Sequence, residues 1–179
     1  MSQVYPDINK WAVPEAALTK TVAAVLPTGL AGRESGVFWL GKRSRTATVS
    51  ALVLPSGQGV EERPEQWRVS PAVFGAISLW AKPKHLALLA IAHIHLPGVP
   101  TALSWADRNL SVQVPGVLAI VIGNGGADRD HSRWSWYVYS GDEYRKMTTV
   151  QLKDRLAIKR IGGLSTWRAD ASGVYEVEI

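Results

Sequence analysis

The chain has 179 residues, of which 46% are hydrophobic and 20% charged, and its formal net charge is +5. This length and composition suit one folded domain spanning residues 1–179 and argue against disorder. The sequence contains no cysteine, which excludes disulfides, thiolate metal ligands and a cysteine nucleophile. The first residues lack a secretory pattern, and no apolar run reaches the roughly 18 residues of a membrane span. We therefore expect a cytoplasmic protein with no membrane association.

The positive charge does not by itself point to a nucleic-acid partner. The basic residues come in small separated groups, such as Lys42, Arg43 and Arg45 near the start and Lys159 and Arg160 near the end. Such spacing is typical of a solvated surface and not of a continuous basic stripe. Four of the eight tryptophans lie in apolar-periodic segments, where we expect core packing and not stacking on bases. We expect no nucleic-acid partner. A nucleic-acid-binding domain is the less favoured alternative, and the salt dependence of binding would reveal it.

Two segments have the pattern of helices. Residues 14–26 begin with proline, a favoured first helical residue, and their apolar side chains recur on one face. Pro27 and Gly29 are expected to end this helix. A second helix is expected after a serine cap, beginning at Pro71 with an apolar inner stripe and ending before Pro83.

Strand patterns fill much of the remaining chain. Residues 36–41 and 47–54 are strand-like runs joined by a polar turn, which predicts a hairpin. The segment 55–68 is rich in glycine, proline and charge and is expected to be a loop. Residues 86–92 and 117–122 are unbroken apolar runs, typical of strands buried on both faces.

The C-terminal part completes the predicted fold. Residues 134–139 alternate as a strand, residues 148–158 are expected to be helical, and residues 175–179 have the alternation of an edge strand. The sequence shows no internal repeat. It therefore predicts an α/β fold of the α+β type, with a single mixed β-sheet flanked by helices.

The pair His93 and His95 follows the most apolar of these strands. Residues two apart on a strand point to the same face, with Cβ atoms about 6–7 Å apart. Two imidazoles placed in this way can converge on one ion, with each Zn–N bond about 2.0–2.1 Å long. A pair of structural histidines is the alternative, which the strand position makes less favoured.

The third candidate ligand is Asp107, in the segment Ser104-Trp-Ala-Asp107. Taken alone, this S-x-x-D pattern is explained by helix capping and needs no metal. With two histidines a short loop upstream, the aspartate on the first helical turn could reach the same ion. Two histidines and one carboxylate leave a fourth position open, which is the layout of a catalytic zinc site.

A fourth residue completes a known pattern. Glu34 precedes an apolar strand that begins at Gly36 and ends at Gly41. This arrangement resembles the JAMM motif of the JAB/MPN zinc metallopeptidases, the family of zinc deubiquitinases and their prokaryotic relatives. The motif combines a glutamate before a Gly-rich strand, an H-x-H pair, a serine and an aspartate three residues further on. The matching residues are Glu34, Gly36, Gly41, His93, His95, Ser104 and Asp107.

The resemblance covers roughly residues 14–140 and has three departures. Val37 stands where the second glycine of the motif often occurs. The gap between the second histidine and the serine is eight residues, where seven is usual in the family. Leu96 follows that histidine directly, where the family usually has proline, and Pro97 comes next. The last two departures fit a one-residue insertion in a loop.

The resemblance implies an MPN/JAB architecture, which is similar to that of cytidine deaminases, and a bound Zn²⁺ held by His93, His95 and Asp107. It implies that Glu34 acts as general base and proton shuttle and that the Ser104 hydroxyl stabilises the developing oxyanion. It further implies cleavage after the C-terminal glycine tail of a ubiquitin-like protein. The partners would be that protein or its conjugates, with E1-like and E2-like proteins of the same pathway, in a bacterial conjugation system with an antiviral role.

Two alternatives remain open within this resemblance. One is a sulfur-carrier hydrolase that releases an amino acid from a small ubiquitin-like carrier. The other is a non-catalytic MPN binding module, in which the motif is kept but zinc is weakly bound or absent. A metal-content assay separates the binding module from either enzyme.

Overall fold

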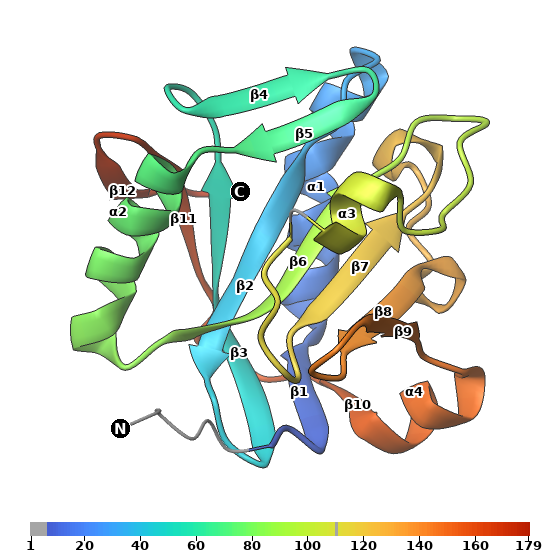
Figure 1. Cartoon of the computed structure of the whole chain (residues 1–179). Helices are drawn as coiled ribbons and strands as arrows, with labels where there is room; N and C mark the ends of the chain where they lie inside the picture. The colour runs from blue at the N-terminus through green and yellow to red at the C-terminus, as the bar shows by residue number, and fades with distance from the viewer. Residues whose placement is uncertain (1–6, 110) are drawn as a thin grey trace.

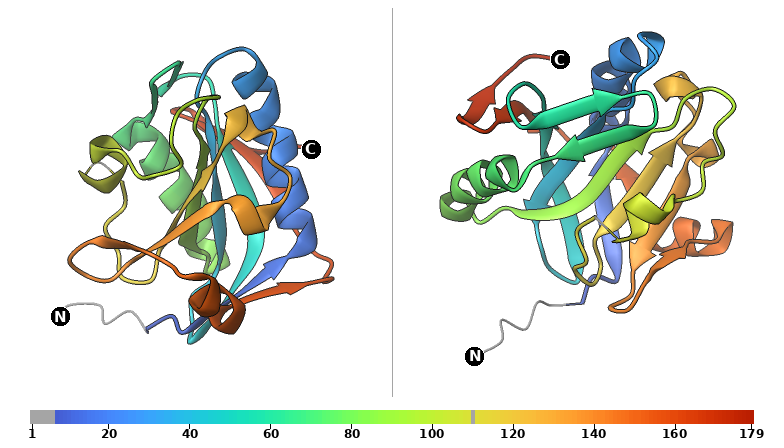
Figure 2. Two further views of the ribbon diagram at one scale, coloured as in Figure 1. Left: turned by 90° about the vertical axis from the view of Figure 1, so that its right-hand side faces the viewer. Right: turned by 45° about the horizontal axis from the view of Figure 1, so that its top comes forward.

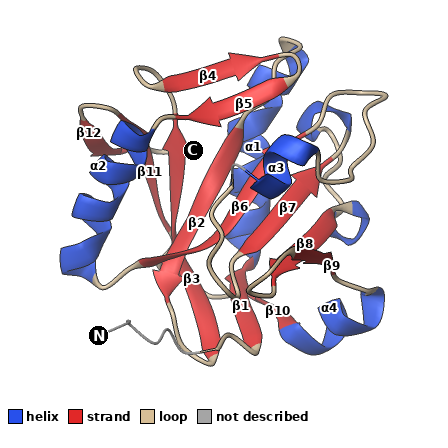
Figure 3. Cartoon of the chain, in the orientation of Figure 1, coloured by secondary structure: helices blue, strands red, loops and turns tan. Residues whose placement is uncertain are grey.

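The computed structural model describes residues 7–109 and 111–179. Ten of its strands form one curled mixed sheet (Figures 1 and 3). Eight of them follow the order β10-β1-β3-β2-β6-β7-β8-β9, and the other two, β11 and β12, are attached through β3. These strands are β1 (Lys10–Pro14), β2 (Gly36–Lys42), β3 (Thr46–Pro55), β6 (Ala87–Ile94), β7 (Leu118–Ile122), β8 (Ser135–Tyr139), β9 (Tyr144–Lys146), β10 (Leu156–Lys159), β11 (Ser165–Asp170) and β12 (Gly173–Glu176).

Helices flank this sheet, and two further strands stand apart from it. The helices are α1 (Glu15–Leu30), α2 (Pro71–Ala81), α3 (Trp105–Asn109) and α4 (Thr149–Arg155), with the 3₁₀ turns η1 (Lys82–Lys84), η2 (Asn124–Gly126) and η3 (His131–Arg133). The separate strands β4 (Val60–Arg63) and β5 (Gln66–Val69) form a two-stranded ribbon. The predicted fold class, a mixed sheet flanked by helices, is confirmed. In the described part of the chain, no helix has the length and apolar character needed to cross a membrane.

The alternation of side chains along the central strands gives the sheet two buried faces. On β2, Trp39 lies in the core under α1 with Val22, whereas its neighbour Phe38 lies in a second core under α2 with Ile77. The side view shows α1 on one side of the sheet, with α2 and α3 on the other (Figure 2). Because both faces are covered, the strands read as continuous apolar runs in the sequence.

The predicted hairpin and the two buried strands are confirmed. Strands β2 and β3 pair antiparallel, and β2 pairs antiparallel with β6 on its other edge. Strand β6 then pairs parallel with β7. A parallel pair needs a long connection between its strands, and here residues 95–117 with α3 make it. This connection passes over the α2 side of the sheet and carries part of the candidate site.

The prediction of a loop over residues 55–68 is wrong. Strands β4 and β5 pair antiparallel there, with Arg63 opposite Gln66 across a two-residue turn. Charged side chains along β4 interrupt the alternation of apolar residues that marks a strand in the sequence. The ribbon nevertheless buries apolar side chains. Trp67 of β5 packs against Phe38, with ring centroids 5.6 Å apart. The ribbon therefore lies over the α2 face of the sheet.

Two helix boundaries also differ from the predicted ones. Helix α1 continues through Pro27 to Leu30, because its final turn is closed by the amide of Ala31, which donates to the carbonyl oxygens of Pro27 and Thr28. Helix α4 ends at Arg155, and the residues after it form β10. Strand β10 pairs parallel with β1, a strand that the sequence pattern did not reveal.

The end of α1 packs closely against η2, which follows β7. A Cβ atom on Gly29 would overlap the carbonyl oxygen of Gly125. Glycine is therefore required at position 29 by close backbone approach, whereas a Cβ on Gly75, on the exposed face of α2, would meet nothing within 4 Å.

These two glycines give a matched pair of variants. We expect Gly29→Ala to lower the free energy of unfolding by roughly 1–3 kcal/mol, because the backbones of α1 and η2 must separate. Gly75→Ala should raise it by about 0.4–1 kcal/mol, because alanine lowers the entropy of the unfolded chain without a clash. Urea denaturation of both variants measures the difference. Equal effects would contradict the close packing of α1 on η2.

Candidate metal centre

Strand β6 places both histidines on the α2 side of the sheet. His93 is two residues from Ile91 on the strand and pairs in register with Gly36 of β2 and Val121 of β7. His95 follows the end of β6, and its amide donates to the carbonyl of Ile122. Both side chains are buried, with 5% and 4% exposure. Their Nε2 atoms lie 3.2 Å apart.

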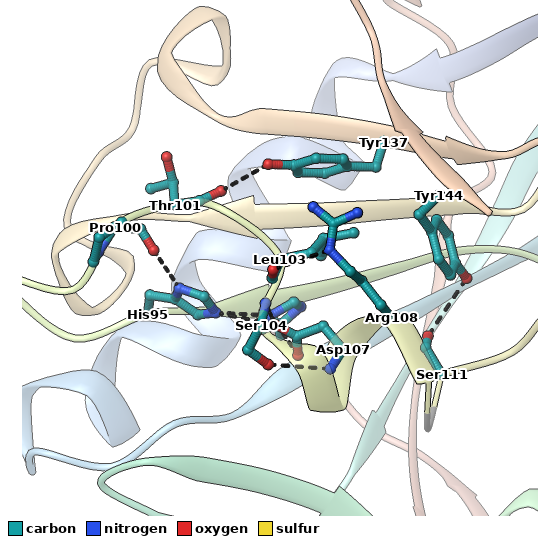
Figure 4. Close-up of polar contacts among 11 residues, drawn as sticks. His95, Pro100, Thr101, Leu103, Ser104, Asp107, Arg108, Ser111, Tyr137 and Tyr144 are labelled. Atoms are coloured by element: carbon teal, nitrogen blue, oxygen red, sulfur yellow. Dashed lines mark hydrogen bonds and ion pairs between the residues drawn. The ribbon is translucent and has the colours of Figure 1, made fainter.

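Helix α3 brings the aspartate to the same place. Asp107 accepts a hydrogen bond from the backbone amide of Ser104 at 2.7 Å, and its own amide donates to the Ser104 hydroxyl oxygen at 3.1 Å. This reciprocal pair is the capping interaction expected from the S-x-x-D pattern. The cap does not compete with a role in the site, because it fixes the direction in which the carboxylate points (Figure 4).

The three side chains converge on one point. The carboxylate of Asp107 lies 3.3 Å from His93 Nε2 through one oxygen and 3.5 Å from His95 Nε2 through the other. Ligand atoms bound tetrahedrally at Zn–N distances near 2.0–2.1 Å are separated by about 3.3 Å. The observed separations are close to this value. His93, His95 and Asp107 form a group that could hold a metal ion.

The hydrogen bonds around the group favour a cation at its centre. His95 Nδ1 lies 2.6 Å from the carbonyl oxygen of Pro100, and this partner can only accept. The Nδ1 atom therefore carries the proton, and in a neutral ring Nε2 has a free lone pair toward His93 and Asp107. That lone pair and the Asp107 carboxylate are acceptors that face each other 3.5 Å apart, and a proton or a metal ion between them would satisfy both.

The pKa values reflect this arrangement. Burial lowers the pKa of His95, but hydrogen bonds to Asp107 and Pro100 outweigh it, so that the pKa is raised. Burial raises the pKa of Asp107, but hydrogen bonds from His93 and His95 outweigh it and hold the pKa well below its usual range. The carboxylate is therefore ionised, as a metal ligand must be.

Glu34 lies at the edge of the same pocket. It is 8% exposed and lines the pocket together with His93, Ser104 and Asp107. Burial raises its pKa, and the nearby histidines partly offset that effect. Its amide donates to the carbonyl oxygen of Arg63 at 2.8 Å. The β4–β5 ribbon thus holds the backbone of Glu34.

The extra residue after the second histidine is absorbed by a turn. The amide of Val99 donates to the carbonyl oxygen of Leu96 at 3.0 Å, and Gly98 between them has a φ of 83°. This left-handed conformation favours glycine. The turn returns the chain so that Pro100 reaches His95. The longer spacing is therefore compatible with the histidine orientation.

Tyrosines of β8 and β9 anchor the connection that carries Ser104 and Asp107. The Tyr137 hydroxyl donates to the carbonyl oxygen of Thr101 at 3.3 Å (Figure 4). The Tyr144 hydroxyl donates to the carbonyl oxygen of Val112 at 2.6 Å. The sequence alone did not reveal these residues, because only the folded structure places β8 and β9 beside the connection. Tyr137 lies in the predicted strand 134–139, whereas Tyr144 lies outside every predicted element.

No protein-family model matches the sequence, and no curated protein matches it. Solved structures are similar in fold. A protein from Desulfitobacterium hafniense is 13% identical with a TM-score of 0.59, over 84% of this chain and 94% of that one. A protein from Salinibacter ruber is 16% identical with a TM-score of 0.52, over 83% and 91%. A JAB1/MPN domain protein from Archaeoglobus fulgidus is 13% identical with a TM-score of 0.42, over 82% and 98%.

At these identities the first two similarities establish a shared fold and no chemistry. A TM-score of 0.42 is too low to support an argument from the third. Fold and site together define an α/β domain with a buried His-His-Asp group that could hold a metal ion. The chemical roles assigned to Glu34 and Ser104 stay predictions.

The tyrosine anchors predict an effect on metal affinity. Loss of one such hydrogen bond costs about 0.5–1.5 kcal/mol. The connection would then be held less firmly, and the position of the Asp107 carboxylate would be less well fixed. We expect Tyr137→Phe to weaken binding of added Zn²⁺ by roughly 2–10-fold. Tyr139→Phe, in the same apolar cluster, is the matched control and should leave the affinity unchanged. Isothermal titration of zinc into each variant measures this, and equal affinities would remove the positioning role.

Proposed function

We propose that this protein is a zinc-dependent peptidase or isopeptidase that cleaves after the C-terminal tail of a ubiquitin-like protein. The observation that carries the proposal is the convergence of His93, His95 and Asp107 in a pocket that Glu34 also lines. The JAMM-like order and spacing of the same residues supports it. The activity belongs either to precursor processing or to deconjugation.

The donor set fits zinc better than other common ions. Two neutral imidazoles and one carboxylate match the ligands of catalytic zinc sites, whereas Mg²⁺ and Ca²⁺ prefer oxygen ligands. His93, His95 and Asp107 would hold the ion and leave a position open. When bound, zinc would polarise a carbonyl group and lower the pKa of water.

The protein's own residues would move the proton and bind the developing charge. Glu34 would accept a proton from the attacking water and pass it to the leaving amine. Its burial, which raises its pKa, suits a group that must both take and give a proton near neutral pH. The Ser104 hydroxyl oxygen accepts a hydrogen bond from the amide of Asp107. The hydroxyl hydrogen of Ser104 is therefore free to donate to the substrate's oxyanion.

The ribbon provides a place for an extended tail. In the described part of the chain, β5 pairs with β4 alone. Its other edge can therefore accept a further strand by backbone hydrogen bonding. Four consecutive residues of β5, from Gln66 to Val69, line the pocket beside the candidate metal centre. A tail bound along this edge would reach the site.

The proposed partners follow from the proposed chemistry. They are a ubiquitin-like protein or its conjugates, together with E1-like and E2-like proteins of a bacterial conjugation system with an antiviral role. A sulfur-carrier hydrolase would use the same site on a smaller carrier. A non-catalytic module would keep the fold without turnover, which the experiments below distinguish.

The metal is tested first. We predict that the purified protein binds about one zinc ion per chain and that His93→Ala and Asp107→Ala abolish this binding, because each removes a ligand. His131→Ala is the control, since His131 lies in η3 outside the group, and it should keep the zinc. Elemental analysis after dialysis gives the stoichiometry. Absence of zinc in the unchanged protein, even after zinc addition, would overturn the proposal.

The division of roles is tested on a linear fusion of a ubiquitin-like protein to a reporter, with casein as an unrelated substrate. We expect cleavage of the fusion and none of casein. Glu34→Gln should keep zinc and slow cleavage by roughly 10²–10⁴-fold, because the amide cannot accept a proton. Ser104→Ala should keep zinc and slow it by about 10²–10³-fold.

Four outcomes would contradict this assignment. Full activity of Glu34→Gln would make Glu34 a bystander, and loss of zinc from that variant would make it a ligand. Equal digestion of casein and the fusion would exclude the proposed substrate class. Bound zinc with no cleavage of any ubiquitin-like fusion or carrier would favour the binding module.

A further inference from the structure

The pocket beside the candidate metal centre has an apolar floor built from three adjacent strands. Phe38 of β2, Ile91 of β6 and Ala119 of β7 are direct neighbours in the register of the sheet, and all three line the pocket. His93 is the next residue after Ile91 on the same face of β6, about 6–7 Å away along the strand. The floor is thus one side-chain row from a candidate metal ligand.

The walls of the pocket stand at opposite ends of this floor, one beside Phe38 of β2 and one beside Ala119 of β7. Trp67 and Val69 of β5 form one wall, and Leu103 and Ala106 beside Asp107 form the other. Figure 1 shows β5 and α3 on the same side of β2, β6 and β7. Ala119 in the floor and Ala106 in the wall have small side chains, which leave room in the pocket.

The charged residues of the lining lie beside the candidate metal centre or are exposed to solvent. Glu34 and Asp107 lie at the metal end, and Glu65 and Arg68 of the ribbon form part of the rim. The floor offers no partner to a charged side chain, and burying an unpaired charge is costly. The apolar floor and walls therefore favour an apolar occupant, and the uncharged polar residues Gln66, Ser104 and Ser111 complete the lining.

We propose that this pocket receives an apolar side chain, of the size of leucine or phenylalanine, from the residue that supplies the scissile carbonyl. The inference rests on the proposed function and specifies its substrate. A residue whose carbonyl is held at the metal centre has its own side chain beside that centre, and the floor lies one side-chain row away. Residues further along an extended chain lie about 3.3 Å more distant with each step.

The pocket lies on the acyl side of the scissile bond because β5 forms its wall. An extended tail that adds to the free edge of β5 runs along this wall before its last carbonyl reaches the centre. Its final side chain then faces the floor. The glycine-ended tail that the JAMM resemblance implies would leave the floor uncovered. The substrate of this protein is therefore expected to end in a larger apolar residue.

The first experiment measures binding without catalysis. The full chain is titrated by NMR with the acetylated amides of leucine, phenylalanine and glycine. Burial of a leucine or phenylalanine side chain should tighten binding roughly tenfold or more relative to the glycine probe. Ala106→Leu and Val69→Trp fill the pocket from opposite walls and should each abolish this preference. Ala102→Leu is the matched control, because Ala102 is exposed and does not line the pocket.

The second experiment varies the last tail residue of the ubiquitin-like fusion among leucine, phenylalanine, glycine and aspartate. We expect kcat/KM to be highest for the apolar residues and to fall for them in the two filled variants. Equal binding of the three probes, or a glycine preference in cleavage, would overturn the pocket assignment. Apolar preference in binding with no cleavage of any fusion would keep the pocket and overturn the proposed function.

Discussion

Two imidazoles and one carboxylate face one another in this protein, and the rest of the site is arranged to keep them there. The Nε2 atoms of His93 and His95 and the carboxylate of Asp107 lie within 3.2–3.5 Å of their neighbours. In a neutral His95 ring the Nε2 lone pair and the Asp107 carboxylate are both acceptors, and a proton or a metal ion between them would satisfy both. Pro100 fixes one imidazole and Ser104 fixes the carboxylate. Strand β6 fixes the backbone of His93, and the carbonyl of Ile122 holds that of His95. Hydrogen bonds and strand geometry thus orient the three side chains toward one another.

The two faces of the sheet divide stability from chemistry. The α1 face is covered by an apolar core that includes Trp11, Trp39 and Trp136, each contributing a large buried area. The other face has smaller clusters under α2 and beside α3, with the polar group between them. Because side chains alternate along β2 and β6, one strand serves both faces. The buried polar site is therefore held by strands whose position the opposite core already determines.

The sequence predicted the parts whose signal is local. Continuous apolar runs gave the central strands, and the H-x-H and S-x-x-D spacings brought out all three candidate ligands. It did not predict the β4–β5 ribbon, because Glu61, Glu62 and Arg63 break the apolar alternation that marks a strand. It also missed β1 and β10, which pair with each other across a separation of more than 140 residues. The hydrogen bonds of Tyr137 and Tyr144 could not be predicted either, because their partners are distant in the sequence and meet them only in the folded protein.

The ribbon that the sequence did not reveal connects the parts of the proposed site. Through the carbonyl of Arg63 it holds the backbone of Glu34, and through Trp67 it covers Gly36, where a Cβ atom would lie 2.5 Å from the ring. Gly36 in turn pairs with His93. The same ribbon offers a free strand edge and one wall of the apolar pocket. A chain bound along β5 therefore contacts the element that positions the proposed base, so substrate binding and the placement of Glu34 depend on one structure.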